Sequence, residues 1–165
     1  MWSAQGDNDN AIFDLEMATQ VSPDYADAWF DLSQLKNSKG DLDGAFAAAK
    51  KAVDLNPKNA QAQSWLGRLH LESGDAALAV KHLQIARSLG VDDKATLYSL
   101  ARALHANGKI EDSKQVDQQV LDMQRLSTRA GEVLFTASGL NEEGLRLKSK
   151  GDIAGALGST VEQSI

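Results

Sequence analysis

Few residues in this chain have the types and spacing that catalysis requires. The three histidines, His70, His82 and His105, fit no metal-ligand spacing such as His-Glu-x-x-His. The absence of cysteine excludes thiol catalysis, disulfides and cysteine-based zinc sites. The sequence contains no glycine-rich phosphate loop and no serine nucleophile elbow. We therefore predict that the protein is not an enzyme and needs no cofactor or metal, and that its histidines serve packing or the surface.

Two arginines have a spacing that suits binding instead. Arg68 and Arg102 are 34 residues apart, which is the period at which small residues recur along the whole chain. The recurring residues form the columns Ala11, Ala45 and Ala79; Ala18, Ala52 and Ala86; Pro23 and Pro57; and Gly6, Gly40, Gly74 and Gly108. Equivalent residues in consecutive repeats lie side by side in a stacked array. Two such guanidinium groups could bind a carboxylate through charge-assisted hydrogen bonds.

The same period predicts which elements position the arginines. A repeat of this length is typical of a stack of short helical hairpins, so the fold class is all-α. Small residues are needed where neighbouring helices cross, and we assign this role to Ser33, Gly67, Ala101, Ala45 and Ala79. Glycine at each Gly-Asp pair suits the end of one helix. Aspartate then caps the next helix, as expected for Asp41, Asp75 and Asp152.

The columns resemble the signature of the tetratricopeptide repeat (TPR) family. The row that starts at Ala26 carries the signature at Trp29, Leu32, Gly40, Ala45, Ala52 and Pro57. The row from Ala60 carries it at Leu66, Gly67, Gly74, Ala79, Leu83 and Ala86, and the row from Lys94 carries a weaker version. The resemblance implies an α-solenoid, a right-handed superhelix of antiparallel helix-turn-helix repeats, in which each repeat has a helix A and a helix B.

The register of this resemblance divides the chain. We expect a partial repeat at 1–25 (the end of helix A, a turn at Gly6-Asp7, and helix B), full repeats at 26–59 and 60–93, a degenerate repeat with an extended helix at 94–127, and an insertion plus a C-terminally truncated repeat at 128–165. The turn at Gly151-Asp152 places the last row at Ala137 rather than Thr128. The insertion predicts a longer helix B, or a longer helix A from about Arg129, that bends the array or projects as an arm.

In the TPR family, A helices line a concave groove that binds peptides. Carried onto this chain, the groove positions give the candidate partner-binding residues Phe30, Gln34, Asn37, Arg68, Leu71, Tyr98, Arg102 and His105. The arginines would grip a carboxylate and the apolar residues would hold side chains of an extended peptide. As an alternative, both arginines could pair with acids such as Glu72. The carboxylate clamp of chaperone-binding members is not matched, since its positions hold Phe30, Gln34, Trp65, Ala95 and Ser99.

Charge and hydropathy limit the classes of partner that the protein can bind. Residues 1–35 contain seven acidic and no basic side chains, whereas the remainder is nearly balanced. This acidity argues against nucleic acid, and it either steers a basic partner or forms a solvated face. No apolar run reaches the roughly 20 residues of a membrane span, so we expect a soluble protein whose compartment the sequence leaves open.

Three functions remain open at this stage. The first is a non-catalytic scaffold that binds a protein or peptide ligand in the groove. The second is a homo-oligomer that assembles through open repeat ends, including Trp2, Ile12 and Leu15. The third is a non-catalytic arm of a larger enzyme or secretion complex. The absence of polar capping helices at both ends indicates a segment of a longer array or a chain whose ends pack against copies of itself.

Overall fold

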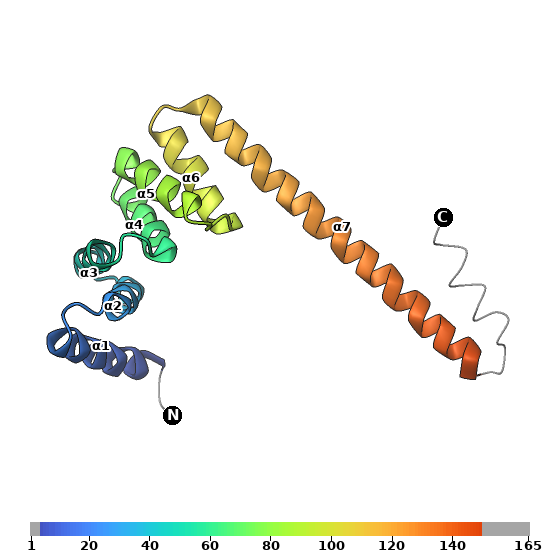
Figure 1. Cartoon of the computed structure of the whole chain (residues 1–165), viewed down its shortest axis with the longest axis horizontal. Helices are drawn as coiled ribbons and strands as arrows, with labels where there is room; N and C mark the ends of the chain where they lie inside the picture. The colour runs from blue at the N-terminus through green and yellow to red at the C-terminus, as the bar shows by residue number, and fades with distance from the viewer. Residues whose placement is uncertain (1–3, 150–165) are drawn as a thin grey trace. The chain divides into compact units, whose positions relative to one another are not determined.

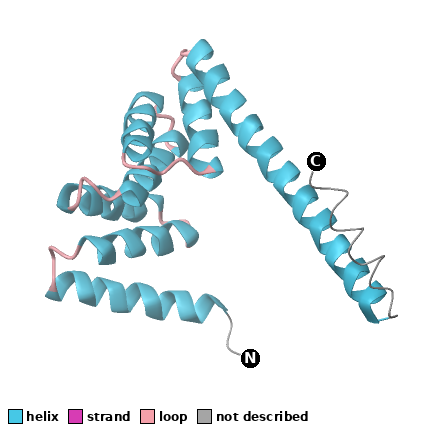
Figure 2. Ribbon diagram, turned by 45° about the vertical axis from the view of Figure 1, so that its right-hand side comes forward, coloured by secondary structure: helices cyan, strands magenta, loops and turns pink. Residues whose placement is uncertain are grey.

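The computed structural model describes the backbone of residues 4–149 and contains only helices and turns within them. The helices are α1 (Ala4–Val21), α2 (Ala26–Ser38), α3 (Leu42–Leu55), α4 (Ala60–Glu72), α5 (Ala76–Ser88), α6 (Lys94–Ala106) and α7 (Ile110–Ser149). Consecutive helices pack as antiparallel pairs, most extensively α2 with α3 and α4 with α5 (Figures 1 and 2). The predicted all-α fold of stacked hairpins is confirmed, and α2, α4 and α6 begin at the predicted row starts.

The Gly-Asp pairs turn the chain as predicted. Gly40 and Gly74 adopt φ values of 82° and 86°, a left-handed conformation that other residues rarely adopt. The carboxylate of Asp41 accepts a hydrogen bond from Gly44 N at 2.9 Å, and that of Asp75 accepts one from Leu78 N at 3.1 Å. Each pair therefore ends helix A and caps helix B, while the expected cap at Asp152 lies outside the described residues.

The small residues lie where the helices cross. Ser33, Ala45 and Ala79 are fully buried, and Ala101 is 3 % exposed. The Ser33 hydroxyl donates to Ala45 O at 2.7 Å and accepts from the Trp65 indole nitrogen at 2.7 Å. This one hydroxyl therefore joins α2 to α3 in its own hairpin and to α4 in the next, which explains a polar residue at a buried crossing.

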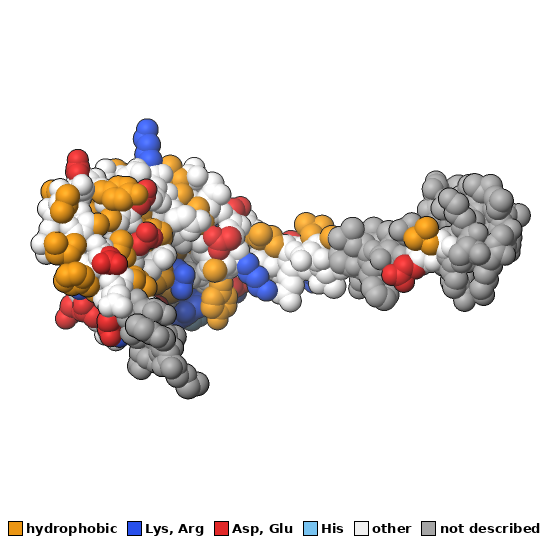
Figure 3. Space-filling model, turned by 90° about the horizontal axis from the view of Figure 1, so that it is seen from below, with side chains coloured by type: hydrophobic (Ala, Val, Ile, Leu, Met, Phe, Trp, Pro, Cys, Tyr) orange, Lys and Arg blue, Asp and Glu red, His pale blue; other side chains and the backbone are white. Residues whose placement is uncertain are grey.

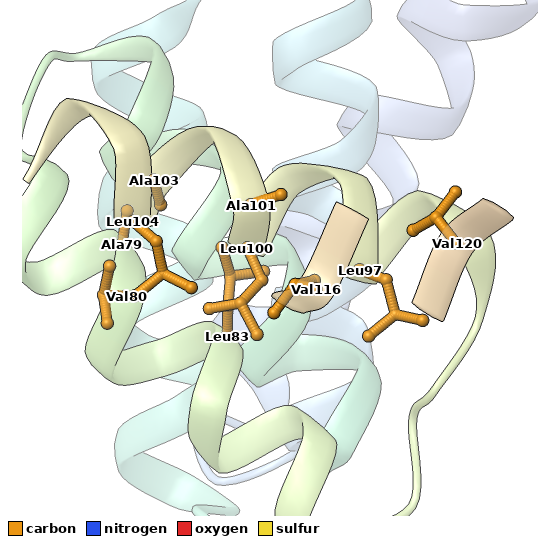
Figure 4. Close-up of a cluster of buried hydrophobic side chains, with 10 residues drawn as sticks. All are labelled: Ala79, Val80, Leu83, Leu97, Leu100, Ala101, Ala103, Leu104, Val116 and Val120. Carbon is orange, nitrogen blue, oxygen red and sulfur yellow. The ribbon is translucent and has the colours of Figure 1, made fainter. Parts of the chain in front are cut away.

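Two apolar clusters form the core of the repeats. One joins α3 to α4 through Ala49, Ala52, Val53, Ala62, Leu66 and Leu69. The other joins α5, α6 and the start of α7 through Ala79, Val80, Leu83, Leu97, Leu100, Ala101, Ala103, Leu104, Val116 and Val120 (Figure 4). Leu83 is fully buried at the centre of the second cluster. Burial is thus distributed along the stack, with each hairpin packing on its neighbours.

Replacing Ala79 with leucine tests the crossing of α4 and α5. Ala79 has no exposed surface, so the added carbons have to displace neighbouring helices. We expect the free energy of unfolding to fall by about 1–3 kcal/mol, measured by urea denaturation. The exposed Ala77 on the same helix is the control, and Ala77→Leu should change stability little. Equal midpoints for both variants would contradict the repeat register.

One predicted turn and one predicted helix start are absent from the described residues, and the predicted turn at Gly151-Asp152 lies outside them. The turn at Gly6-Asp7 is wrong, because α1 runs through both residues from Ala4. The separate A helix expected from Ala137 is also not formed, because α7 is one helix up to Ser149. Of the two predicted outcomes, the structure has the longer B helix.

The start of α7 differs from α3 and α5 at two core columns. Lys114 stands where α3 has Phe46 and α5 has Val80, and Asp117 stands where they have Ala49 and Leu83. Ala49 and Leu83 are fully buried, whereas Lys114 and Asp117 are exposed. If the chain turned and a further helix packed on this face of α7, the charged groups of Lys114 and Asp117 would have to be removed from water. This cost gives a physical reason for α7 to continue as a single helix.

The chain divides into two compact units within α7. Residues up to Val120 belong to the repeat unit, and residues from Leu121 belong to a second unit. In the second unit the described side chains of α7 are solvent-exposed, including Leu126 at 69 % and Leu145 at 59 %. The predicted binding residues and both apolar clusters all lie in the repeat unit.

Candidate protein-interaction surface

Both predicted arginines are exposed, and each lies over an aromatic ring of its own helix. The guanidinium carbon of Arg68 is 5.1 Å from the centre of a Trp65 ring on α4. That of Arg102 is 5.9 Å from the centre of the Tyr98 ring on α6. Spacings of three and four residues put each pair on one helix face. The rings stabilise and orient the cations without neutralising them, so both remain able to bind an anion.

The alternative of arginines neutralised by acids is not what the structure shows. Within the described residues, neither Arg68 nor Arg102 forms an ion pair, and Glu72 is exposed. Arg87 provides the contrast, since it bonds Asp92 at 3.2 Å and Gln119 at 2.8 Å. Within the described residues, both guanidinium groups are therefore without an ion-pair partner.

Three of the predicted residues line one shallow hollow. Leu71 of α4 and Arg102 and His105 of α6 share it with residues at the crossing of α6 and the start of α7. Those further residues are Ala101, Ala106, Ser113 and Asp117. The hollow combines an apolar wall, a guanidinium, an imidazole and a carboxylate. It can hold a short polar side chain or a chain terminus that presents both a donor and an acceptor.

The predicted residues of α2 differ from one another in position. Phe30 is half-buried against the α3–α4 cluster, so most of its ring contributes to packing. Gln34 is exposed, and Asn37 is half-buried with an Oδ1 atom that has no hydrogen-bond partner within the described residues. Tyr98 is 57 % exposed beneath Arg102. Most of the exposed residues among the predicted ones thus lie on α4 and α6 rather than on α2.

Three residues beside the predicted ones were not identified as candidates by the sequence analysis. Trp65 lies under Arg68, and its spacing of three residues was the available signal. Ser113 and Asp117 line the hollow. Asp117 was visible as a charge in an apolar column, but only the structure shows that it faces the same space as Arg102 and His105.

The histidines form a pair that the sequence did not indicate. His70 of α4 stacks on His82 of α5, with ring centres 5.3 Å apart and planes inclined by 5°, and the edge of Phe46 meets His70 at 4.7 Å. Pro57 O accepts from Gln63 Nε2, which turns Gln63 Oε1 toward His82, so His82 Nδ1 donates to it at 2.8 Å. Burial lowers the pKa of both rings, and the neighbouring His70 and Lys81 add to the lowering of the His82 pKa. Both rings are therefore held neutral as packing groups.

The part of the chain that the structure describes has no group of three or more histidine, aspartate or glutamate side chains placed to hold a metal. Within residues 4–149, no helix combines the length and the apolar character that crossing a membrane requires.

Some of the acidic side chains near the N-terminus form ion pairs between helices. Lys36 Nζ lies 2.7 Å from a Glu16 carboxylate oxygen and 3.5 Å from one of Asp41, and Lys39 Nζ lies 2.6 Å from Asp9. The hydrogen bond to Glu16 raises the pKa of Lys36. The pairs with Glu16 and Asp9 join α1 to the end of α2, while Asp14, Asp24, Asp27 and Asp31 face solvent.

Comparison with known proteins identifies the family. One tetratricopeptide repeat model matches residues 36–99 and a second matches residues 3–60, so together they span more than half of the chain. The chain belongs to the tetratricopeptide repeat family, whose repeats are protein-interaction modules, and we describe it as a helical interaction scaffold. No protein with curated annotation matches the chain in sequence.

Solved structures of MamA share the fold. One crystal structure of MamA superimposes with a TM-score of 0.68 at 21 % identity and covers 94 % of this chain and 85 % of its own. A second, titled MamA RS-1 ArsTM double mutant, has a TM-score of 0.67 at 16 % identity and covers 93 % and 81 %. A third MamA structure has a TM-score of 0.65 at 18 % identity and covers 74 % and 67 %. At these identities the likeness shows the helical-repeat fold.

Proposed function

We propose that the A-helix face of α4 and α6 binds an extended segment of a partner protein that carries a carboxylate beside apolar side chains. One observation carries this proposal: Arg68 and Arg102 hold equivalent positions in neighbouring repeats, are exposed, and rest on aromatic rings without an ion pair among the described residues. Binding a ligand through an arginine that is already held in position loses less conformational entropy than binding through a side chain that must first be ordered. A carboxylate can accept two parallel hydrogen bonds from such a group.

The neighbouring side chains indicate what should flank that carboxylate. Tyr98 is largely exposed, and Leu71 is half-buried on the wall of the hollow, so both offer apolar contact. Asp117 and His105 in the same hollow favour a ligand group that also donates a hydrogen bond. The preferred ligand is therefore an acidic segment with interspersed apolar residues.

The test compares two charge-reversal variants. Arg68→Glu combined with Arg102→Glu should weaken binding of captured partners, or of a fluorescent Asp- and Leu-containing peptide, by at least about 100-fold, because hydrogen bonds to charged groups contribute about 1.5–3 kcal/mol each. Lys50→Glu with Lys51→Glu makes the same charge change on exposed positions of α3 and should bind nearly as tightly as wild type.

Circular dichroism and thermal melting check the fold of both variants. Both arginines are exposed, so helicity and melting temperature should remain close to wild type. Equal binding by the two variants would contradict the proposal, and unfolding of the arginine variant would contradict the surface assignment. Capture of nothing but other copies of the chain would favour self-association instead.

A further inference from the structure

One face of α1 carries exposed apolar side chains in a row. Phe13 is 62 % exposed, Met17 is 44 % exposed and Val21 is 78 % exposed. Steps of four residues place them next to each other along one helix face. We call these three residues the α1 apolar face. Apolar groups this large and contiguous on a surface are typical of interaction sites.

The repeat register shows that this exposure does not come from a missing neighbour in the stack. The positions equivalent to Phe13 are Ala47, Lys81 and Gln115, and all three are exposed. The positions equivalent to Met17 are Lys51, Ile85 and Gln119, of which only Ile85 is half-buried. Apart from Ile85, the residues of both columns face solvent in α3, α5 and α7, and four of these six equivalents are polar. Phe13 and Met17 are therefore large apolar residues at positions that are mostly polar in the other repeats, and packing of a further repeat would not bury them.

Acidic side chains flank the α1 apolar face on both edges. By helical spacing, Asp14 lies on one edge, and Asp9 and Glu16 lie on the other, where they pair with lysines of α2. Residues 1–35 contain no basic side chain of their own. Viewed from the side of α1, the repeat unit shows apolar and acidic groups intermingled (Figure 3). An occupant of this face should therefore supply apolar side chains and positive charge together.

We infer that the α1 apolar face is a second docking surface, separate from the arginine surface, and that its occupant is an amphipathic helix with lysine or arginine beside its apolar residues. The apolar side chains of such a helix would cover Phe13 and Met17. Its cations would lie beside Asp14, which is exposed and forms no ion pair within the described residues, whereas Asp9 and Glu16 are already paired with Lys39 and Lys36. The arginine surface selects the opposite charge, so one scaffold could hold an acidic and a basic segment at once.

The test uses a fluorescein-labelled 18-residue helical peptide of leucine and lysine, with the leucines on one face. Wild-type protein should bind it, and Phe13→Ser with Met17→Ser should weaken binding at least ten-fold. The matched control is Leu42→Ser with Leu89→Ser, which removes two exposed apolar side chains from α3 and the end of α5 and should leave binding unchanged. Asp14→Asn should lower the affinity and its dependence on salt.

Three results would overturn this inference. The first is equal binding by the Phe13→Ser, Met17→Ser variant and wild type. The second is equal binding of a peptide in which glutamate replaces lysine. The third is a wild-type dimer in sedimentation that the same variant converts to monomer, which would make a second copy the occupant. The Arg68→Glu, Arg102→Glu variant should bind the peptide like wild type, so failure of the arginine surface would leave this surface unaffected. Peptide-induced shifts of α1 amides in NMR spectra provide a check that needs no variant.

Discussion

Leu83→Ala is expected to lower the free energy of unfolding by about 2–5 kcal/mol, the range for removing a fully buried leucine. Leu83 has no exposed surface and lies at the centre of the cluster that joins α5, α6 and the start of α7 (Figure 4). Removing it leaves a cavity among three helices, which can close only by shifting their axes. Urea denaturation followed by circular dichroism measures the change. The exposed Leu42 is the control, and Leu42→Ala should cost far less.

A second substitution, at Gly67 of α4, tests whether Leu83 of α5 acts at the crossing of these two helices. A Cβ atom on Gly67 would lie 2.7 Å from Leu83 Cγ and 3.1 Å from Leu83 N. Gly67→Ala should therefore destabilise the protein by about 1–3 kcal/mol through overpacking, although alanine has the higher helix propensity. Leu83→Ala removes the side-chain contacts and leaves the backbone nitrogen at 3.1 Å, so in this background the same substitution should cost less. Additive effects of the two substitutions would show that Gly67 and Leu83 do not share this contact.

Acidification from pH 7.5 to pH 5.5 should destabilise the repeat unit through the stacked histidine pair. The pKa values of His70 and His82 are lowered in the folded protein from the ordinary value of 6.5. The unfolded chain therefore takes up protons first, so the pair's contribution is complete above pH 6.5 and is lost as the pH falls toward the lowered values. Burial is the main cause at both rings, Asp75 partly opposes the effect at His70, and Lys81 reinforces it at His82.

Melting temperatures across this pH range measure the effect. His70→Phe keeps an aromatic ring between Phe46 and His82 but cannot be protonated, so its melting temperature should fall less than that of wild type. His105→Gln changes an exposed histidine outside the pair, so the melting temperature of this variant should fall as much as that of wild type. Carboxylates titrate mainly below this range, which separates their contribution. The same fall in all three proteins would contradict the assignment.

The sequence predicted those parts of the fold that local rules determine. Gly40 and Gly74 need a left-handed backbone, Asp41 and Asp75 cap the helix that follows, and Ser33 and Ala79 need small volumes, so a repeating row of residues was enough. The A-helix starts at Ala26, Ala60 and Lys94 followed from the same register. The turn at Gly6 and the helix start at Ala137 were wrong, because α1 and α7 each continue as one helix through these positions.

The candidate site was predictable only in part. Repeat spacing identified Arg68 and Arg102, but the supporting rings of Trp65 and Tyr98 and the charge of Asp117 in the same hollow as His105 depend on side-chain directions. Phe30 looked like a groove residue and also packs on the core, because its helix face borders both. The stacking of His70 on His82 joins the two helices of one hairpin, a contact that a 34-residue period does not encode.

Lys114 and Asp117 also bear on how far folding cooperativity can spread. In a one-dimensional array, each interface couples the folding of one repeat to the next, and the coupling depends on the apolar area that the two repeats share. The columns of Ala49 and Leu83 supply that area at the first two interfaces, and a lysine and a carboxylate take the corresponding places at the start of α7. We therefore expect α1 to the start of α7 to unfold as one cooperative unit, which ends where these two charged side chains replace apolar ones.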